Sequence, residues 1–329
     1  MATDTDSKKH NETFQVHDSF GKDLIDKYDG FILDQFGVLH NGVCGLEGAP
    51  DLVKTLRQTH NKKLVILSNT SSSSESCKAK LPILGFDVKD FCNAVTSGEE
   101  AGRHIRDIYA KSDKKALWFT WKTQNTPLRF LKLCGNVPLT TDPSEADYVI
   151  LHGVDLLRGP GEDGNAEEIS LGDFHTSGKL DESNSSTTIE SILQVCAERK
   201  LPMVCANPDF IIVKPDGSTG YMPGTISKRY KNLGGSCESF GKPHVPHFEA
   251  CLRDLGLDKT KVVHVGDSLH HDIKGANDAG IDSVFVAGGI HRTELGSELN
   301  AVPDTEALKE LFEKHGQMPT HVVPMFRMQ

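Results

Sequence analysis

Several kinds of segment are missing from this 329-residue sequence, and each absence narrows the range of functions. No run of apolar residues approaches the roughly 20 that a membrane-spanning helix needs. The eight cysteines include no Cys-x-x-Cys pair, so we predict reduced thiols rather than a zinc ribbon or a redox motif. Basic residues are outnumbered, 36 against 46 acidic, and the resulting net charge of -10 argues against nucleic acid or an anionic membrane as the main partner.

The first nineteen residues, MATDTDSKKHNETFQVHDS, lack the apolar core of a secretory signal. They also contain several acidic residues, which transit peptides largely avoid. We therefore expect a cytoplasmic protein with a flexible N-terminal tail over residues 1–19.

The rest of the chain alternates short apolar segments with helical patterns, which is typical of parallel βαβ units. Between the first two predicted strands, residues 49–63 place Leu52, Val53 and Leu56 at helical spacing. We predict an α/β fold with strands at residues 30–36, 63–69, 93–97, 115–121, 147–153, 201–207, 261–267 and 282–288.

Two segments have the composition of connections rather than of regular elements. Residues 158–188 are rich in Gly, Ser, Asp and Glu and are predicted to form a long surface loop. Residues 230–243, YKNLGGSCESFGKP, precede a strong helix and strand pattern, so they could mark the return from one domain to another.

Polar side chains that could take part in catalysis or ligand binding stand where three predicted strands end. Asp34 follows the first strand, Ser68 and Asn69 end the second, and Asp267 ends the strand at 261–267. Ligands of open α/β sheets bind outside the carboxyl ends of the strands, so we expect these residues to converge on one crevice.

These residues suit phosphoryl chemistry, although each one also has a simpler structural explanation. The Asp34 carboxylate can attack phosphorus as a nucleophile, and Asp267 with Asp272 can bind Mg²⁺. Ser68 and the backbone amides after it can hold a phosphoryl oxygen, and Lys242 can neutralise charge. Helix capping for the aspartates and the serine, and a solvated surface position for the lysine, are the alternatives.

Taken in order, four motifs resemble those of the haloacid dehalogenase superfamily. They are LDQFGVL with Asp34, ILSNTS with Ser68, GKP with Lys242, and VGDSLHHDIKGANDAG. The segments CANPDF and YMPGTIS resemble the class IIA branch, which includes p-nitrophenyl and sugar-phosphate phosphatases. This resemblance implies a Rossmann-like core at residues 20–105 and 230–329, and an α/β cap at 106–229 inserted after the third core strand.

The resemblance also implies a role for each matching residue. Asp34 would be the nucleophile of a Mg²⁺-dependent phosphohydrolase, with Lys242, Ser68 and Asn69 holding the phosphate. Asp34, the backbone carbonyl of Phe36, Asp267 and Asp272 would form the metal site, and Asn207 and Asp209 would stand near the phosphate where cap and core meet. The expected partners are a small phosphorylated metabolite and, by analogy, a second copy of the chain.

Phe36 departs from the family pattern, because phosphatases of this family usually place an aspartate there as general acid and base. Its loss should cost roughly 3–5 kcal/mol of barrier when the leaving group is an alkoxide. His40, His270, His271 and Asp209 are possible substitutes, although packing or surface exposure is the simpler expectation for each. His291 and Arg292, in a loop at a strand end, could also reach the crevice.

Two other functions remain open at this stage. A catalytically weak protein could bind a phosphorylated metabolite through Mg²⁺, Ser68 and Lys242 without turning it over. A metal-independent dehalogenase would tolerate an aromatic residue at position 36, but it would have no use for the Asp267 and Asp272 carboxylates.

Overall fold

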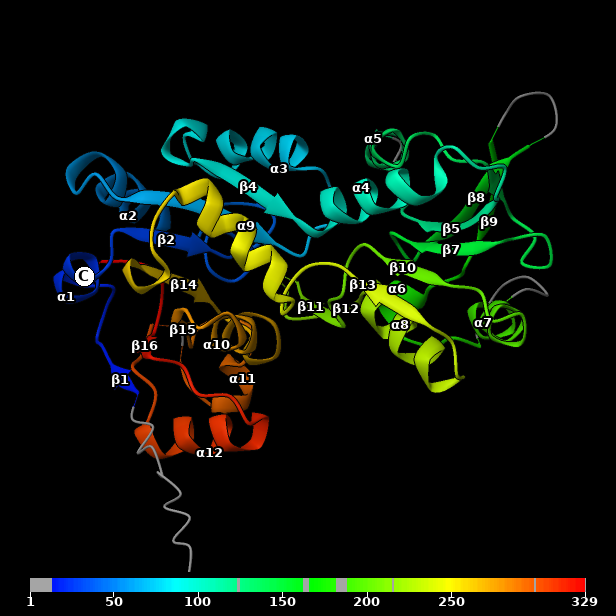
Figure 1. Cartoon of the computed structure of the whole chain (residues 1–329). Coiled ribbons are helices and arrows are strands. Elements are labelled where there is room, and N and C mark those ends of the chain that lie inside the picture. The colour runs from blue at the N-terminus through cyan, green and yellow to red at the C-terminus, as the bar shows by residue number, and fades with distance from the viewer. Residues whose placement is uncertain are drawn as a thin grey trace, which may run out of the picture.

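The computed structural model describes residues 14–122, 125–161, 166–181, 188–214, 216–298 and 300–328. These residues form two α/β domains that lie side by side, each built around its own sheet (Figure 1). No helix within these ranges is both long enough and apolar enough to cross a membrane. All eight cysteines are free thiols.

The first domain contains a seven-stranded sheet in the order β1-β16-β15-β14-β2-β3-β4. Every neighbouring pair is parallel, as the alternating pattern predicted. Its strands are β1 (Gln15–Val16), β2 (Gly30–Leu33), β3 (Lys63–Ser68), β4 (Asn93–Thr96), β14 (Val262–Gly266), β15 (Asp282–Val286) and β16 (His321–Val323).

Helices cover both faces of this sheet, because successive side chains of each buried strand point to opposite sides. Leu33 and Ile66 pack toward α1 and α2, whereas Ile32 and Val65 pack toward α9 and α10. The helical segments are α1 (Lys22–Lys27), α2 (Ala49–Lys54), η1 (Thr55–Thr59), α3 (Ser74–Lys80), η2 (Leu81–Leu84), η3 (Val88–Asp90), α9 (Val245–Leu255), η5 (Lys259–Lys261), η6 (Leu269–Ile273), α10 (Lys274–Ala279), α11 (Arg292–Leu295) and α12 (Thr305–His315).

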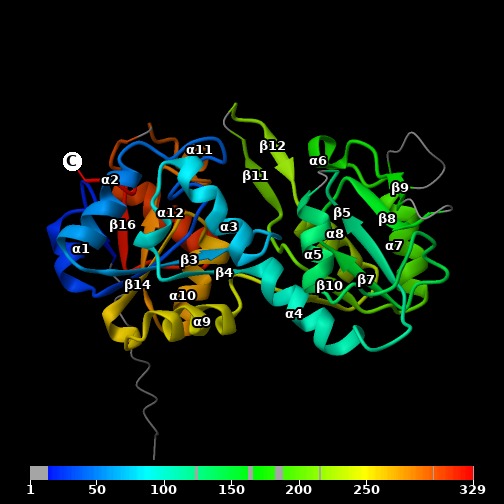
Figure 2. The same ribbon diagram turned by 90° about the horizontal axis from the view of Figure 1, so that it is seen from above.

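The second domain is inserted after β4 and has a mixed sheet in the order β13-β10-β7-β5-β8-β9, with β6 also pairing with β5. A separate hairpin, β11 (Ile211–Val213) with β12 (Thr219–Tyr221), stands between the two domains in Figure 2. The sheet strands are β5 (Ala116–Thr120), β6 (Leu139–Thr140), β7 (Tyr148–Leu151), β8 (Leu156–Pro160), β9 (Ala166–Ser170), β10 (Met203–Cys205) and β13 (Cys237–Ser239).

Two apolar clusters hold this domain together, one on each face of its sheet. Trp118 and Ile150 pack with Ile105 of α4, while Phe119 and Val149 pack toward the opposite helices. The helices are α4 (Ser97–Tyr109), α5 (Asn125–Leu133), α6 (Phe174–Ser177), α7 (Ile189–Glu198) and α8 (Pro223–Asn232).

The fold class agrees with the sequence prediction, but some boundaries differ. Residues 158–188 were expected to be a loop, yet β8 pairs antiparallel with both β5 and β9, and Arg158 forms an ion pair with Glu168. Strand β13, which the boundary at residue 230 placed with the core, pairs with β10 of the second domain. Part of the expected N-terminal tail forms β1, while residues 1–13 lie outside the described ranges. Strands β1 and β13 pair with strands that are distant in the sequence, and β8 pairs both with the distant β5 and with the nearby β9.

Candidate active site

A cavity of about 630 Å³ opens at the carboxyl ends of β2, β3 and β14, where the sequence predicted a crevice. Its floor includes Asp34, Ser68, Lys242, Asp267 and Asp272. The β11–β12 hairpin contributes part of the wall through Ile211, Ile212 and Val213. The cavity therefore lies between core and inserted domain, and it has the size of a small-molecule site.

Lys242 is the centre of a buried ion-pair network on the floor of this cavity. Its Nζ lies 2.5 Å from Asp34 Oδ1 and 2.7 Å from Asp272 Oδ1, and its side chain is 3% exposed. Asp272 also accepts hydrogen bonds from His264 Nε2 at 2.8 Å and from the Ser268 amide at 3.0 Å. Lys242 is thus a fixed, buried cation and not a solvated surface residue.

The pKa values in this network follow from burial and from the neighbouring charges. Burial and the nearby Asp272 charge outweigh the attraction of Lys242 and raise the pKa of Asp34 to about 7. Burial alone would raise the pKa of Asp272, but Lys242 and the bond from His264 bring it below its ordinary value. Burial disfavours the charge of Lys242, yet the two carboxylates raise its pKa above the usual range. Asp272 and Lys242 are therefore the permanently charged pair.

Asp267 is the third buried carboxylate, and the chain leaves room for it. Glycines stand at positions 37 and 289, where a β-carbon would overlap the Asp267 side chain, and Gly37 also has a φ of +85°. The Ile290 amide donates to Asp267 Oδ2 at 2.8 Å. Burial and repulsion from Asp34 and Asp272 raise the pKa of Asp267 well above its ordinary value.

The three carboxylates fit a divalent cation. Oxygen atoms of Asp34, Asp267 and Asp272 lie within 4.8 Å of one another, and all three residues are buried. Mg²⁺ prefers carboxylate oxygens, and it would relieve the repulsion that raises the pKa values of Asp34 and Asp267. Asp34 and Asp267 are the ligands that we favour, because burial and repulsion raise their pKa values, whereas Lys242 and His264 together stabilise the charge of Asp272.

We expect Mg²⁺ to raise the melting temperature more at pH 8 than at pH 5. The folded-state pKa of Asp34 is about 7 against 3.8 for the free side chain, so the metal-free folded state holds an extra proton between these values. The stabilisation of the folded state by this extra proton declines as the pH rises from about 4 to 7. Above this range Asp34 is ionised, and the site can bind a metal cation without releasing that proton. Thermal unfolding with and without Mg²⁺ measures the difference. Equal shifts at the two pH values, or an undiminished shift in Asp267→Asn, would count against this metal site.

Asn69 joins the two domains next to Lys242. Its side-chain oxygen accepts from the Lys242 amide at 2.7 Å, and its Nδ2 donates to Asp209 Oδ1 at 2.7 Å. Asn207 Oδ1 accepts from the Asp209 amide at 3.0 Å, so Asn207 positions Asp209. Ser68 Oγ lies on the cavity floor and already accepts from the Thr70 amide at 3.2 Å.

Phe36 lines the cavity but brings no proton-transfer group to it. Of the four substitutes suggested by the sequence, Asp209, His270 and His271 line the same cavity. His271 Nδ1 lies 3.5 Å from Asp209 Oδ1. His40 is outside the described lining, its Nδ1 accepts from the Gly42 amide at 3.0 Å, and burial lowers its pKa to about 4.

Some contributors to the site were missed at the sequence level. His264, inside β14, contacts Asp272 and thereby orients it, and β11 of the hairpin forms part of the cavity wall. His264 precedes Asp267 by three residues, but an apolar strand pattern gives no sign of its partner. His291 and Arg292 do line the cavity.

Comparison with known proteins identifies the family. A model described as haloacid dehalogenase-like hydrolase matches residues 31–130, and a second, HAD-hydrolase-like, matches residues 239–314. Together they take in Asp34, Ser68, Lys242, Asp267 and Asp272. The chain belongs to the haloacid dehalogenase-like hydrolases. The resemblance predicted from the sequence motifs is thereby confirmed.

Relatives within the haloacid dehalogenase-like hydrolases include sugar phosphatases. An acid sugar phosphatase of Staphylococcus haemolyticus is 24% identical over 86% of this chain and 94% of its own. The structure of a possible sugar phosphatase from Cytophaga hutchinsonii superposes with a TM-score of 0.68 at 19% identity, covering 96% of this chain and 100% of that one. A glycerol phosphate phosphatase from Mycobacterium tuberculosis, in complex with calcium, gives 0.57 at 19%, covering 92% and 75%.

Proposed function

We propose that this protein is a Mg²⁺-dependent phosphohydrolase that acts on a small phosphorylated metabolite through an aspartyl-phosphate. The observation that carries the proposal is the buried cluster of Asp34, Lys242 and Asp267 on the floor of the 630 Å³ cavity. The names of the relatives, acid sugar phosphatase and glycerol phosphate phosphatase, support the same reaction class. The glycerol phosphate phosphatase is in complex with calcium, which supports the use of a divalent cation.

The reaction would proceed in two displacements at phosphorus. The Asp34 carboxylate attacks the phosphoryl group, the new bond to phosphorus forms, and the leaving oxygen departs with the electron pair of the broken bond. Water then attacks the aspartyl-phosphate, which releases inorganic phosphate and regenerates Asp34. Lys242 and Ser68 hold the phosphoryl oxygens, and bound Mg²⁺ supplies charge neutralisation.

Phe36 restricts the leaving group under this proposal. A side chain without an ionisable proton cannot protonate a departing alkoxide. The leaving group of an acyl or aryl phosphate, in contrast, departs as a stable anion. The water of the second displacement still needs a base, and we propose that Asp209 and His271, 3.5 Å apart on the cavity wall, provide it. The Asp209 carboxylate is held by Asn69, so its position depends on the contact between the domains.

Phosphate release from acetyl phosphate, p-nitrophenyl phosphate and glycerol phosphate tests the function. We expect Mg²⁺-dependent turnover of the first two and turnover on the order of 10²-fold slower for the third, because only an alkoxide needs the missing acid. In Phe36→Asp, which restores a carboxylate, the difference should narrow. If none of the three is hydrolysed above the Asp34→Asn background while Mg²⁺-dependent binding persists, the binding-protein alternative replaces the enzyme. In a separate assay with a haloacid, halide release in the absence of metal would favour a dehalogenase.

A further inference from the structure

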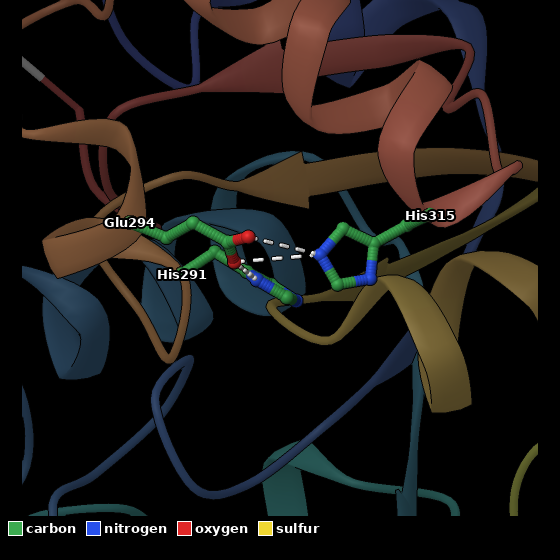
Figure 3. Close-up of side chains that lie close together, drawn as sticks. All are labelled: His291, Glu294 and His315. Carbon is green, nitrogen blue, oxygen red and sulfur yellow. Dashed lines mark hydrogen bonds and ion pairs between the residues drawn. The ribbon is translucent and has the colours of Figure 1, made fainter.

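A second cluster of metal-ligating side chains lies at the edge of the cavity, apart from the three aspartates. It consists of His291, Glu294 and His315, which point toward one another in Figure 3. His291 is the residue before the short helix α11, Glu294 lies within that helix, and His315 is the last residue of α12. Glu294 and His315 are 21 residues apart in the sequence, and the packing of α12 beside α11 brings them together.

We propose that His291, Glu294 and His315 form a second metal site, which takes Zn²⁺ or a similar divalent transition metal ion. Two imidazoles and one carboxylate are a ligand set that zinc uses where a fourth position stays open to water or to a bound molecule. The aspartate cluster on the cavity floor offers only oxygen ligands, which suit Mg²⁺. The two sites therefore differ in the metal that they prefer.

The spacing of the three ligand atoms supports this assignment. Glu294 Oε2 lies 2.9 Å from His291 Nδ1 and 3.4 Å from His315 Nε2, and the three ligand atoms are all within 4.8 Å of one another. Ligand atoms around a tetrahedral zinc, at bonds of about 2.0–2.1 Å, are separated by about 3.3 Å. Small side-chain adjustments would therefore suffice to close the site around an ion.

The surroundings hold the ligands in the charge states that a metal requires. Glu294 is ionised, because the bonds from Lys314 and the two histidines outweigh burial and lower its pKa to about 2. Lys314 Nζ binds Glu294 Oε1 at 2.5 Å. His315 Nε2 lies 3.2 Å from this oxygen and 3.4 Å from Oε2, and Oε2 also contacts His291 Nδ1 at 2.9 Å. Burial lowers the pKa of His291, which favours the neutral ring. In known metal sites, hydrogen bonds to a ligating carboxylate hold it in position, as Lys314 does for Glu294 here.

Metal binding requires the ring proton of His291 to move from one nitrogen to the other. The Leu269 amide donates to its Nε2 at 3.3 Å, so in the metal-free protein Nδ1 carries the proton and donates it to Glu294. A metal ion at Nδ1 displaces that proton, and the ring then protonates at Nε2 at the expense of the long Leu269 contact. The metal–ligand bonds must outweigh this one weak hydrogen bond.

The site faces the cavity. His291 and His315 line it, together with Arg292, whereas Glu294 is not among its described lining residues. An ion held here would thus sit at the cavity wall, with its open position toward the bound molecule. Resting on the proposed function, we infer that it coordinates a carboxylate or hydroxyl oxygen on the organic part of the substrate, away from the phosphate.

Titration of the metal-free full-length protein with Zn²⁺ against a chromophoric chelator, in excess Mg²⁺ to occupy the aspartate cluster, tests the site. We expect one tight Zn²⁺ equivalent in the wild type and at least about tenfold weaker binding in His315→Ala and in Glu294→Gln, since loss of a ligand should cost no less than loss of its supporting partner. His104→Ala is the matched control, because His104 pairs with Glu238 at 3.4 Å outside any three-group cluster. Both cluster residues are partly exposed, so these variants should fold.

Two outcomes would overturn the proposal. If the wild type binds no Zn²⁺, the cluster is only a hydrogen-bonded link between α11 and α12. If the cluster variants bind Zn²⁺ as tightly as the wild type, the ion sits elsewhere, for example at the exposed thiols Cys44 and Cys92. Because the readout is metal binding and not turnover, failure here is distinct from failure of the phosphatase proposal.

Discussion

Replacing Asp34 by Asn should lower phosphate release from p-nitrophenyl phosphate on the order of 10³-fold or more. The Asp34 carboxylate is the nucleophile of the first displacement, and an amide cannot take its place in forming the covalent phosphate. Asn has nearly the shape of the protonated carboxyl that the raised pKa of about 7 already favours. The fold should therefore persist, and the loss should appear in kcat.

A buried aspartate away from the cavity gives the matched control for this experiment. Asp90 is 7% exposed and is not among the described lining residues, so Asp90→Asn should keep wild-type kcat. Steady-state kinetics with circular dichroism of each variant separates chemistry from folding. Full activity in Asp34→Asn would refute the nucleophile assignment, and similar losses in both variants would indicate a general effect of buried substitutions.

Replacing Lys242 by Met should lower the free energy of unfolding by about 3–5 kcal/mol, the usual cost of leaving a buried charge without its partner. Lys242 is 3% exposed and bridges Asp34 and Asp272 at 2.5 and 2.7 Å. Without it, two buried carboxylates lie close together, and only His264 and the Ser268 amide still donate to Asp272 among the described contacts. Turnover should disappear as well, because the phosphate loses its cation.

Urea denaturation followed by circular dichroism measures this loss, because the signal reports on the helices and strands of both domains. Lys274→Met is the control, because Lys274 forms an exposed pair with Asp278 that should be worth less than about 1 kcal/mol. The Lys242→Met deficit should shrink at pH 5, where Asp34 takes up a proton. A deficit no larger than that of the control would contradict the buried network.

The strand ends show which part of the candidate site can be predicted from local sequence. Asp34, Ser68 and Asp267 each follow a run of buried apolar residues, and parallel strands must end on the same edge of the sheet. Their meeting at one cavity was therefore predictable from the chain alone. The partners of Lys242 were predictable only in kind, because its contacts with Asp34 and Asp272 span 208 and 30 residues of sequence.

Other features depended on packing that no local pattern encodes. The bond between Asn69 and Asp209 joins the two domains, and the start of the segment at 158–188 became part of β8 because the distant strand β5 offered it an edge. The sequence pattern gave no indication that His315, at the end of α12, contacts Glu294. In each case the deciding neighbour is far away in the sequence.

The sequence by itself determined the α/β class, the strand ends that bear the aspartates, and the aromatic residue at position 36, since hydrophobic periodicity and residue type are local properties. Only the tertiary structure decided which carboxylate is neutralised by Lys242, which carries a raised pKa, and which histidines reach the cavity. These depend on burial and on charges a few ångströms apart, and such distances are fixed by the packing of the two domains and not by the order of residues.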